Sequence, residues 1–241
     1  MALTFDGSSD NLSTATALFS AASDTTFTIS LVAWCRPDNK HQGTIIGADN
    51  GSSYADQFSI YCVSGGKFRV RHESSYITGS TAFGNANSTW FHVAAVIEYS
   101  DRWLYLDGVE DASDGANRAM DVENADTFYI GNNRLSERFE GAIAEAAAYN
   151  TSLTADEIAA LAAGYSPLFI QPDNLVGYWP LGGISYPADY ADVSQGNDLT
   201  ATGSPSIVDH PPIIYPTTPA ILTAAPPETA DTLAAINYYY R

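Results

Sequence analysis

Short segments in which apolar and polar residues alternate recur along the chain and predict β-strands. In residues 26–34, Phe27, Ile29 and Leu31 fall on one side of an extended chain, because successive side chains of a strand point to opposite faces. Comparable segments lie at residues 44–47, 57–63, 67–72, 90–99 and 102–109. Many short strands separated by turn residues favour an all-β sandwich of antiparallel strands over a parallel sheet.

Glycine-containing turns join some of these predicted strands. Ser64-Gly65-Gly66 separates residues 57–63 from residues 67–72, which is typical of a hairpin. In the second strand of this hairpin Lys67, Arg69 and Arg71 alternate with apolar residues and therefore share one face. This row of cations is either a binding stripe or, in the interpretation that we favour, a solvent-exposed outer face that discourages pairing with other chains.

One helix is predicted after these strands. Residues 154–157, Thr-Ala-Asp-Glu, have the spacing of a capping box, in which Thr154 accepts from the Glu157 amide and Glu157 reaches back. Ile158, Leu161 and Ala162 would share a face, and Gly164 suits the left-handed position that ends a helix. A helix of about ten residues is too short to be stable alone, so we expect it to pack on the sandwich.

The end of the chain is rich in proline. Seven of the twelve prolines lie between Pro205 and Pro227, and proline fixes φ and lacks an amide hydrogen. We therefore predict one sandwich domain over residues 1–210, followed by an extended arm over residues 211–241. Prolines and tyrosines, which suit interfaces, are its candidate partner-binding residues: Pro211, Pro212, Tyr215, Pro216, Tyr238, Tyr239 and Tyr240.

Composition and charge exclude several classes of partner. A chain of 241 residues, 45% of them hydrophobic, fits one large sandwich. Its net charge of −18 disfavours nucleic acids and anionic membrane surfaces. The first residues lack the basic start of a signal peptide, and no segment approaches the roughly 18 apolar residues of a membrane span. We therefore expect synthesis in the cytoplasm without an export signal.

The two cysteines continue the apolar sides of predicted strands. Cys35 alternates with Ala33 and Leu31, and Cys62 alternates with Ile60. We expect two buried free thiols, with a disulfide between neighbouring strands as the alternative. Zinc is not expected, because two cysteines and scattered histidines do not form a ligand set.

The order of segments in residues 90–158 resembles the laminin G-like, concanavalin A-like lectin and glucanase jelly-roll family. The matching segments are WFHVAAV at residues 90–96, WLYLDGV at 103–109, YIGN at 129–132, FEGAIAE at 139–145 and YNTSLTADEI at 149–158. Residues 175–181 and 195–203 resemble opening strands of the family, and residues 3–12 match a family strand and turn. The resemblance implies a two-sheet antiparallel jelly roll with one short helix, closed by segments from both ends of the chain.

The family divides into sugar binders, glucan-cleaving enzymes and structural modules. Its glucanases carry Glu-x-Asp-x-Glu or a one-residue-longer form along one strand, so that the carboxylates share a face. This chain has no such spacing, and the nearest group is Glu137, Glu140 and Glu145. His92 matches a frequent family histidine, and we expect it to be packed in its strand rather than catalytic. We therefore predict a protein that is not an enzyme.

Calcium is the cofactor that the acidic loops would suit, because it takes six to eight hard oxygen ligands. Such loops are Asp49-Asn50 with Asp56, residues 111–114 and residues 121–126. The candidate metal ligands are Asp121, Glu123 and Asp126. Many laminin G-like chains read Ile-Asp-Glu where this chain has Ile143-Ala144-Glu145, so the resemblance implies one carboxylate fewer. The expectation that we favour is no cofactor, with acidic loops as ordinary surface and calcium as the alternative.

Sugar binding would need an exposed aromatic ring beside amide or carboxylate groups. The candidates are Tyr54, Tyr76, Asn132 and Asn133. The alternative for them is ordinary packing, since the chain has 15 tyrosines.

Two functions fit the sequence. The first is a non-enzymatic structural protein of a bacteriophage virion, such as a capsid decoration or head-fibre protein. It would bind other virion proteins and further copies of itself, as a homo-oligomer, through the sandwich edges and the arm. This prediction rests on an extracellular-type fold without an export signal. The second is a lectin-like adhesion module that binds glycans, with or without calcium.

Overall fold

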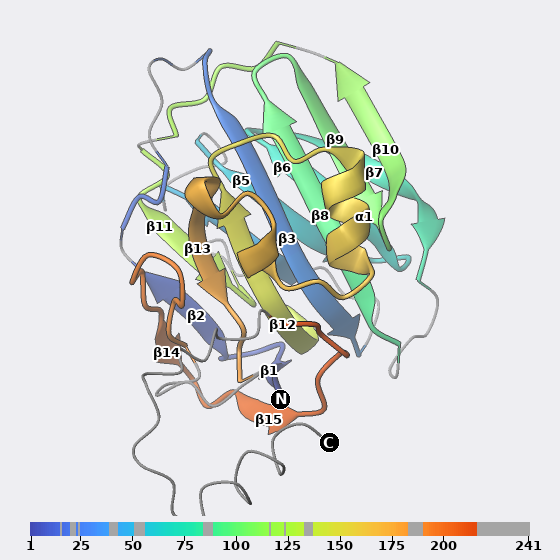
Figure 1. Ribbon diagram of the computed structural model, residues 1–241, viewed down its shortest axis with the longest axis vertical. Helices are drawn as coiled ribbons and strands as arrows, with labels where there is room; N and C mark the ends of the chain where they lie inside the picture. Colours follow the sequence, from blue (N-terminus) through green and yellow to red (C-terminus); the bar gives the residue numbers. More distant parts are fainter. Residues whose placement is uncertain are drawn as a thin grey trace, which may run out of the picture.

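The computed structural model is a sandwich of two antiparallel β-sheets with one α-helix on an outer face (Figure 1). The structure describes residues 1–14, 16–19, 23, 25–38, 43–50, 56–83, 89–115, 117–122, 124–132, 137–182 and 190–215. Within these ranges no helix is long and apolar enough to cross a membrane. The all-β jelly-roll prediction is confirmed.

The eight-stranded sheet has β12 near its centre. Its order is β10 (Val109–Gly115), β9 (Asp101–Leu106), β8 (Phe91–Glu98), β3 (Thr28–Pro37), β12 (Glu140–Tyr149), β1 (Ala2–Asp6) and β15 (Ser206–Val208). On the side away from β3, β1 pairs with the first half of β12, and β13 (Leu175–Trp179) pairs with the second half. Segments from both ends of the chain therefore flank one central strand.

The seven-stranded sheet forms the other layer. Its order is β14 (Thr200–Thr202), β2 (Asn11–Thr14), β11 (Thr127–Ile130), β4 (Gly43–Asp49), β5 (Phe58–Val63), β6 (Lys67–His72) and β7 (Ser75–Ala82). The predicted hairpin is β5 paired with β6, with Ile60 opposite Val70. Here too the N-terminal β2 pairs with the late β14, Leu12 lying opposite Ala201. Closure of the sandwich by both ends of the chain is thus confirmed.

Apolar side chains from the inner faces of the two sheets form the main core. Leu31, Val93 and Ile143 come from the eight-stranded sheet, and Phe58 and Val70 come from the seven-stranded sheet; all are buried. Their alternation with outward-facing residues is the pattern that the sequence predicted.

The two cysteines lie in this core as buried thiols that form no disulfide, as predicted. Burial raises the pKa of Cys62 to about 12 and also raises the pKa of Cys35. Because the thiolate is the reactive form of cysteine, both thiols are chemically quiet in the folded protein.

Helix α1 (Ala155–Ala162) covers the outer face of the eight-stranded sheet (Figure 1). The predicted capping box is present: Thr154 Oγ1 accepts from the Glu157 amide at 3.3 Å, and Glu157 Oε2 accepts from the Thr154 amide at 2.8 Å. Ile158 and Leu161 are buried in a second apolar cluster with side chains of β3, β8, β12 and β13. Gly164, at φ 95°, then ends the helix as predicted, and two short 3-10 turns, η1 (Pro167–Phe169) and η2 (Pro172–Asn174), lead into β13.

Candidate functional site

The outer face of the seven-stranded sheet carries rows of polar and aromatic side chains. Residues paired across neighbouring strands point to the same side of a sheet, so the register defines these rows. One row crosses β11, β4, β5, β6 and β7 as Tyr129, Gly47, Ser59, Arg71 and Tyr76. A second row crosses β4 to β7 as Thr44, Tyr61, Arg69 and Thr78. We call the outward-facing side of β11 and β4 to β7 the polar face.

A buried ion pair lies at the centre of the polar face. Arg71 Nη2 is 2.8 Å from Glu137 Oε1, and each side chain is 8% exposed. Thr44 Oγ1 donates to Glu137 Oε2 at 3.4 Å, and the Arg71 guanidinium lies 4.8 Å from the centroid of the Tyr61 ring. Burial of a guanidinium is tolerated here because a carboxylate neutralises it.

The sequence-based placement of Arg71 on a solvent-exposed face is wrong. Arg71 does point outward from β6, but Glu137 lies against the same face of the sheet, and the residue is only 6% exposed. The segment before β12 brings this carboxylate to the sheet, since the Thr44 amide donates to the Glu137 carbonyl at 2.9 Å. The contact joins residues 66 positions apart, so local alternation could not predict it.

Hydrogen-bonding groups continue from the ion pair toward β11. Gln57 Nε2 donates to the Tyr129 hydroxyl at 3.2 Å. Burial, together with the charge of the neighbouring Asp49, raises the pKa of Tyr129 well above its ordinary value, so this hydroxyl stays protonated. Gln57 Oε1 and Ser59 Oγ are buried without a hydrogen-bond partner among the described residues. Buried polar atoms are usually paired, so these two retain hydrogen-bonding capacity.

The accessible part of the polar face lies on β6 and β7. The side chain of Tyr76 is exposed, at 50% of its area. The Arg69 guanidinium lies 4.2 Å from the centroid of this ring, and Arg69 Nε donates to Thr78 Oγ1 at 2.8 Å. Lys67, two positions before Arg69, is partly exposed on the same side of β6. An exposed aromatic ring is thus fixed beside oriented hydrogen-bond donors.

The structure brings only part of the predicted sugar site to this face. Tyr76 lies there, whereas Asn132 follows β11, and β4, β5 and β6 stand between these two strands. At about 4.8 Å per strand, Tyr76 and Asn132 are too far apart to hold one sugar ring. Tyr54 and Asn133 lie outside the described residues. Tyr61, whose ring contacts the Arg71 guanidinium, was not among the predicted site residues. Alternation could have indicated that it points to the outer face, because its neighbours Ile60 and Cys62 face the core.

A second polar centre lies on the outer face of the eight-stranded sheet. Glu145, at a bulge in β12 with φ 52°, is 2% exposed. Its carboxylate accepts from the Tyr178 hydroxyl at 2.5 Å and from the Tyr215 hydroxyl at 2.7 Å, and His210 Nε2 lies 3.0 Å from its Oε1. Tyr215 is one of the predicted arm residues, so the start of the arm contacts the sandwich here.

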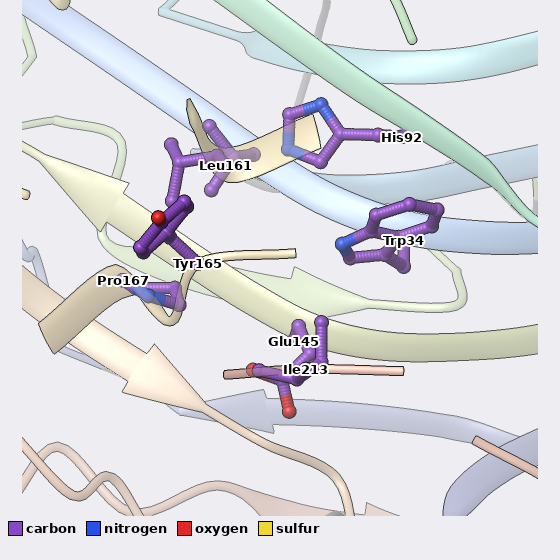
Figure 2. Close-up of a pocket in the computed structure, with 8 residues that line it drawn as sticks. Trp34, His92, Glu145, Leu161, Tyr165, Pro167 and Ile213 are labelled. Atoms are coloured by element: carbon purple, nitrogen blue, oxygen red, sulfur yellow. The ribbon is translucent and has the colours of Figure 1, made fainter. Parts of the chain in front are cut away.

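The Glu145 carboxylate borders a niche that the start of the arm covers. Its lining includes Trp34, His92, Leu161, Tyr165 and Ile213, which Figure 2 shows around Glu145. Pro211 is buried and Pro212 is exposed in this segment, whereas Pro216, Tyr238, Tyr239 and Tyr240 lie outside the described residues.

His92 is the packed strand histidine that the sequence predicted. It is 1% exposed and contacts Trp34 edge to face at 5.4 Å between ring centroids. Burial lowers its pKa to about 3, so the ring is neutral at ordinary pH.

The three glutamates nearest to a glucanase motif are dispersed. Glu137 lies against the outer face of the seven-stranded sheet and pairs with Arg71, whereas Glu145 lies on the outer face of the opposite sheet. Glu140 is exposed at the start of β12. They do not form the pair of facing carboxylates that glycoside cleavage uses.

Described carboxylates of the acidic loops accept hydrogen bonds from the protein itself. Asp121 accepts from the Asn124 side chain at 2.8 Å, and Asp126 accepts from Thr127 Oγ1 at 3.0 Å. Glu123, the third candidate calcium ligand, lies outside the described residues. In the described part of the chain no three His, Cys, Asp or Glu side chains gather as a metal site would require. The expectation of no cofactor, with calcium as the alternative, stays a prediction.

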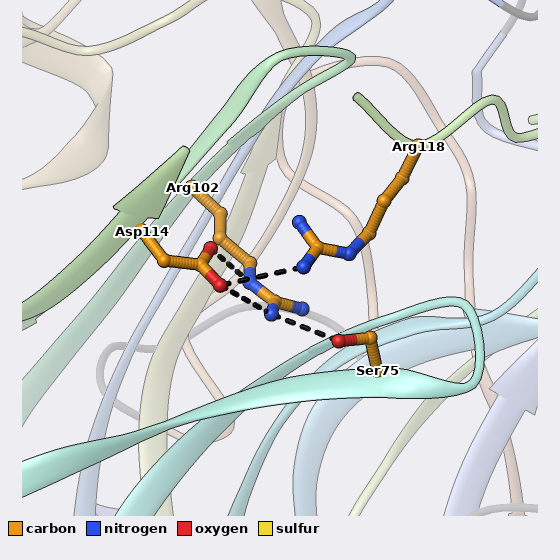
Figure 3. Close-up of polar contacts among 4 residues, drawn as sticks. All are labelled: Ser75, Arg102, Asp114 and Arg118. Carbon is orange, nitrogen blue, oxygen red and sulfur yellow. Dashed lines mark hydrogen bonds and ion pairs between the residues drawn. The ribbon is translucent and has the colours of Figure 1, made fainter. Parts of the chain in front are cut away.

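The carboxylates of residues 111–114 join the two sheets. Asp114 binds Arg102 through both oxygens, at 2.8 and 2.9 Å, and Arg118 at 3.3 Å, while Arg102 also donates to Ser75 at 3.0 Å (Figure 3). The hydrogen bond from Arg102 lowers the pKa of Asp114. Asp111 similarly accepts from Ser80 and Thr81 of β7. These acids stabilise the side of the sandwich where β10 and β7 are neighbours.

Comparisons with known proteins agree with this architecture. A family model described as the concanavalin A-like lectin/glucanases superfamily matches residues 6–159. No curated protein sequence matches the chain at a significant level.

Solved structures share the fold at low sequence identity. A candidate carbohydrate binding protein from Bacteroides ovatus gives a TM-score of 0.62 at 16% identity over 88% of this chain, which spans 61% of that protein's length. Domain 4 of AbnA, a GH43 extracellular arabinanase from Geobacillus stearothermophilus, in complex with arabinotriose, gives 0.52 at 20% identity, covering 67% of this chain and 76% of that one. The CBM40 of Ruminococcus gnavus IT-sialidase, bound to α2,3-sialyllactose, gives 0.50 at 15% identity, covering 58% and 84%.

Proposed function

Because the chain belongs to the concanavalin A-like lectin/glucanases superfamily, we propose that it is a carbohydrate-binding module whose sugar site is the accessible part of the polar face. The observation that carries this proposal is the exposed Tyr76 ring beside Arg69 on the outer face of β6 and β7. Three structurally similar proteins support it, since one is a candidate carbohydrate binding protein and the other two are bound to an oligosaccharide.

The chemistry of the accessible strip suits a sugar ring. The apolar C–H face of a pyranose or furanose can pack on the exposed Tyr76 ring, as apolar surfaces pack on aromatic rings generally. The Arg69 guanidinium lies over one face of this ring, so a sugar would pack on the exposed remainder of the ring, and its hydroxyls could accept from the guanidinium nitrogens that do not bind Thr78. Arg69 is already held by Thr78 and Tyr76, so its side chain loses little conformational entropy on binding.

Binding without cleavage is part of this proposal. A retaining or inverting glycosidase needs two carboxyl groups on either side of the scissile bond. On the polar face Glu137 is bound to Arg71 and Thr44, which fits a structural role for this carboxylate. Sugar release from a laminarin-type polymer would contradict the non-enzymatic proposal.

A glycan array compared between variants tests the site. Wild-type protein should bind a defined set of glycans, and Tyr76→Ala should weaken that binding at least tenfold, which is about 1.4 kcal/mol. Tyr165→Ala is the matched control, because Tyr165 is also exposed, at 45%, but lies beyond α1 by the opposite sheet. The array is run with calcium and with a chelator to test metal assistance. Absence of binding to every glycan, or an equal loss of binding in the two variants, would contradict the proposal.

A structural role on a virus particle is the second candidate. The observation that favours it is the start of the arm, residues 211–215, which lies on the outer face of the eight-stranded sheet, away from the polar face. Attachment through the arm would therefore leave the sugar site free. We propose other virion proteins and further copies of the chain as its partners. Removal of residues 216–241 should abolish association with the particle or the oligomer while glycan binding persists; unchanged assembly would exclude this role for the arm.

A further inference from the structure

We propose that a cavity between β8, β9 and the start of α1 binds a primary ammonium group, such as the end of a lysine side chain. The cavity has a volume of about 280 Å³. It lies on the outer face of the eight-stranded sheet, where α1 lies over β8 (Figure 1). Binding there is independent of glycan binding, because the polar face lies on the other sheet.

Two aromatic side chains of β9 line the cavity. Trp103 lies opposite Val96 across β9 and β8, and it packs against the second apolar cluster, to which Val96 belongs. Tyr105, two positions later, points to the same face and is part of that cluster. Packing against the cluster holds the partly buried Trp103 in place, and the negative face of an aromatic ring attracts a cation.

A carboxylate lines the same cavity. Glu98 follows Val96 by two positions on β8, and one of its oxygens accepts a hydrogen bond from the Ser152 hydroxyl. No other residue in the described part of the chain hydrogen-bonds to this carboxylate. Its second oxygen is therefore able to accept from a bound donor, while the first is held by Ser152.

The hydroxyl groups beside Glu98 have already used their hydrogens. Ser152 donates to Glu98, and Thr154 Oγ1 donates to Glu157 at 2.9 Å. None of the described residues that line the cavity is a lysine or an arginine. A sugar needs donors as well as acceptors for its hydroxyls, whereas an ammonium group has three donors and no acceptor. The lining therefore suits an ammonium group better than a sugar.

The surroundings of the cavity carry negative charge. Glu110 of β10 lies opposite Tyr105, and burial, together with this neighbouring charge, raises the pKa of Tyr105. Asp156 and Glu157 lie in the first turn of α1 and offset the positive end of its dipole. In a chain of net charge −18, this arrangement raises the local concentration of cations.

The size of the cavity also favours a small group. Cavities that bind small molecules usually have volumes of about 300–1,000 Å³, so a volume of about 280 Å³ is at the lower end. The methylene groups of a lysine side chain can pack along apolar surface while the charged end stays with polar groups. Trp103 would supply the apolar surface, and Glu98 would bind the charged end.

Titration of the full chain with small amines tests the proposal. Amide and indole NMR signals are recorded at pH 7 and low salt while butylamine or Nα-acetyl-lysine amide is added. Both should shift the Trp103 indole signal and the Glu98 amide signal to saturation, and Tyr76 should stay unchanged. Saturation by butylamine alone would assign the cavity to free amines. Nα-acetyl-norleucine amide, which has a similar carbon chain without the ammonium group, should bind at least tenfold more weakly than the lysine compound.

A matched pair of variants locates the charge that binds the amine. Glu98→Gln should weaken binding at least tenfold, because the carboxamide keeps an acceptor oxygen but has no charge. Glu140→Gln removes the same charge at the opposite end of β3, since Glu98 lies opposite Thr28 and Gly141 lies opposite Pro37. It should leave the affinity unchanged.

Several results would overturn the proposal. Absence of a saturable shift with both amines would do so, as would equal affinity for the lysine and norleucine compounds. Equal losses in Glu98→Gln and Glu140→Gln would show that only net charge matters. Methyl glucoside is added in a separate titration: saturation of the Trp103 signal by this sugar, with both amines inactive, would make the cavity a second sugar site instead.

Discussion

Arg71 organises the centre of the polar face. Its guanidinium lies over the Tyr61 ring and is paired with Glu137, and the pair is almost fully buried. An ion pair at such a site adds little net stability over a well-packed apolar pair, but loss of one partner leaves an uncompensated charge. The pair adjoins the accessible strip of Arg69 and Tyr76, because Arg71 lies opposite Tyr76 across β6 and β7.

Removal of the Glu137 carboxylate tests this view. Glu137→Ala should lower the free energy of unfolding by about 3–5 kcal/mol, because Arg71 would remain buried without its partner. Urea unfolding followed by circular dichroism measures the change. The double variant R71L/E137L should recover most of the loss. A loss below about 1 kcal/mol in Glu137→Ala would mean that the pair is solvated rather than buried.

Buried histidines should make the fold sensitive to acid. Burial lowers the pKa of His72 to about 4 and that of His92 to about 3, whereas an unfolded histidine titrates near 6.5. Between these values the unfolded chain binds more protons, so stability falls as the pH falls, by up to about 1.4 kcal/mol per pH unit for each histidine.

His92→Leu isolates one of these contributions. Between pH 6.5 and pH 4.5 the wild-type protein should lose stability, and the variant should lose clearly less over the same range. Urea midpoints at the two pH values give the comparison. Equal slopes for both proteins would show that His92 does not titrate on unfolding in this range.

The sequence predicted single residues well where the signal was local. Period-two alternation put the cysteines in the core, and Tyr76, a candidate because sugar binding needs an exposed aromatic ring, is indeed exposed. It failed where a distant segment decides burial, as Glu137 does for Arg71, and it did not predict that Glu145 would collect Tyr178, Tyr215 and His210. Those contacts join residues 33 to 70 positions apart.

At the scale of elements, α1 is the part that the sequence specifies most completely. Its capping box, its buried pair Ile158 and Leu161, and Gly164 at its end are all local features. The helix packs on the second apolar cluster and so covers part of the outer face of the eight-stranded sheet, on the opposite side of the sandwich from the polar face.

Loss of the helix cap tests the contribution of this local signal. Thr154→Ala removes the acceptor for the Glu157 amide and should lower the free energy of unfolding by about 1 kcal/mol. Thr200→Ala, at an exposed position of β14, is the control and should change stability by less than about 0.5 kcal/mol. Equal effects of the two substitutions on urea unfolding would argue against a stabilising cap.

Strand order was beyond the reach of local patterns. Leu3 of β1 lies opposite Ile143 of β12 and Ile207 of β15, pairings that no turn or alternation encodes. The resemblance to the family supplied the closure by both chain ends. The polar face likewise depends on the register between β11 and β4 to β7, which places Tyr129, Arg71 and Tyr76 in one row. These pairings join distant segments, so local patterns do not predict them.

At the scale of the whole molecule, the two outer faces differ in kind. One is covered by α1 and residues 210–215, and the other presents polar and aromatic side chains that become accessible on β6 and β7. Three of the ten lysines and arginines lie on β6, in a chain with net charge −18. Two of these three, Lys67 and Arg69, are partly exposed, and such donors in an acidic chain are the whole-molecule argument for a ligand site there.

Mapping of a bound glycan on the folded chain tests the central claim most directly. Backbone amide chemical shifts are recorded while the glycan that binds best on the array is added to isotopically labelled protein. The largest shifts should fall on Arg69, Tyr76 and Thr78, and Tyr165 should remain unchanged. Shifts confined to the acidic loop around Asp121, or to residues 210–215 and the niche beneath them, would contradict a sugar site on the polar face.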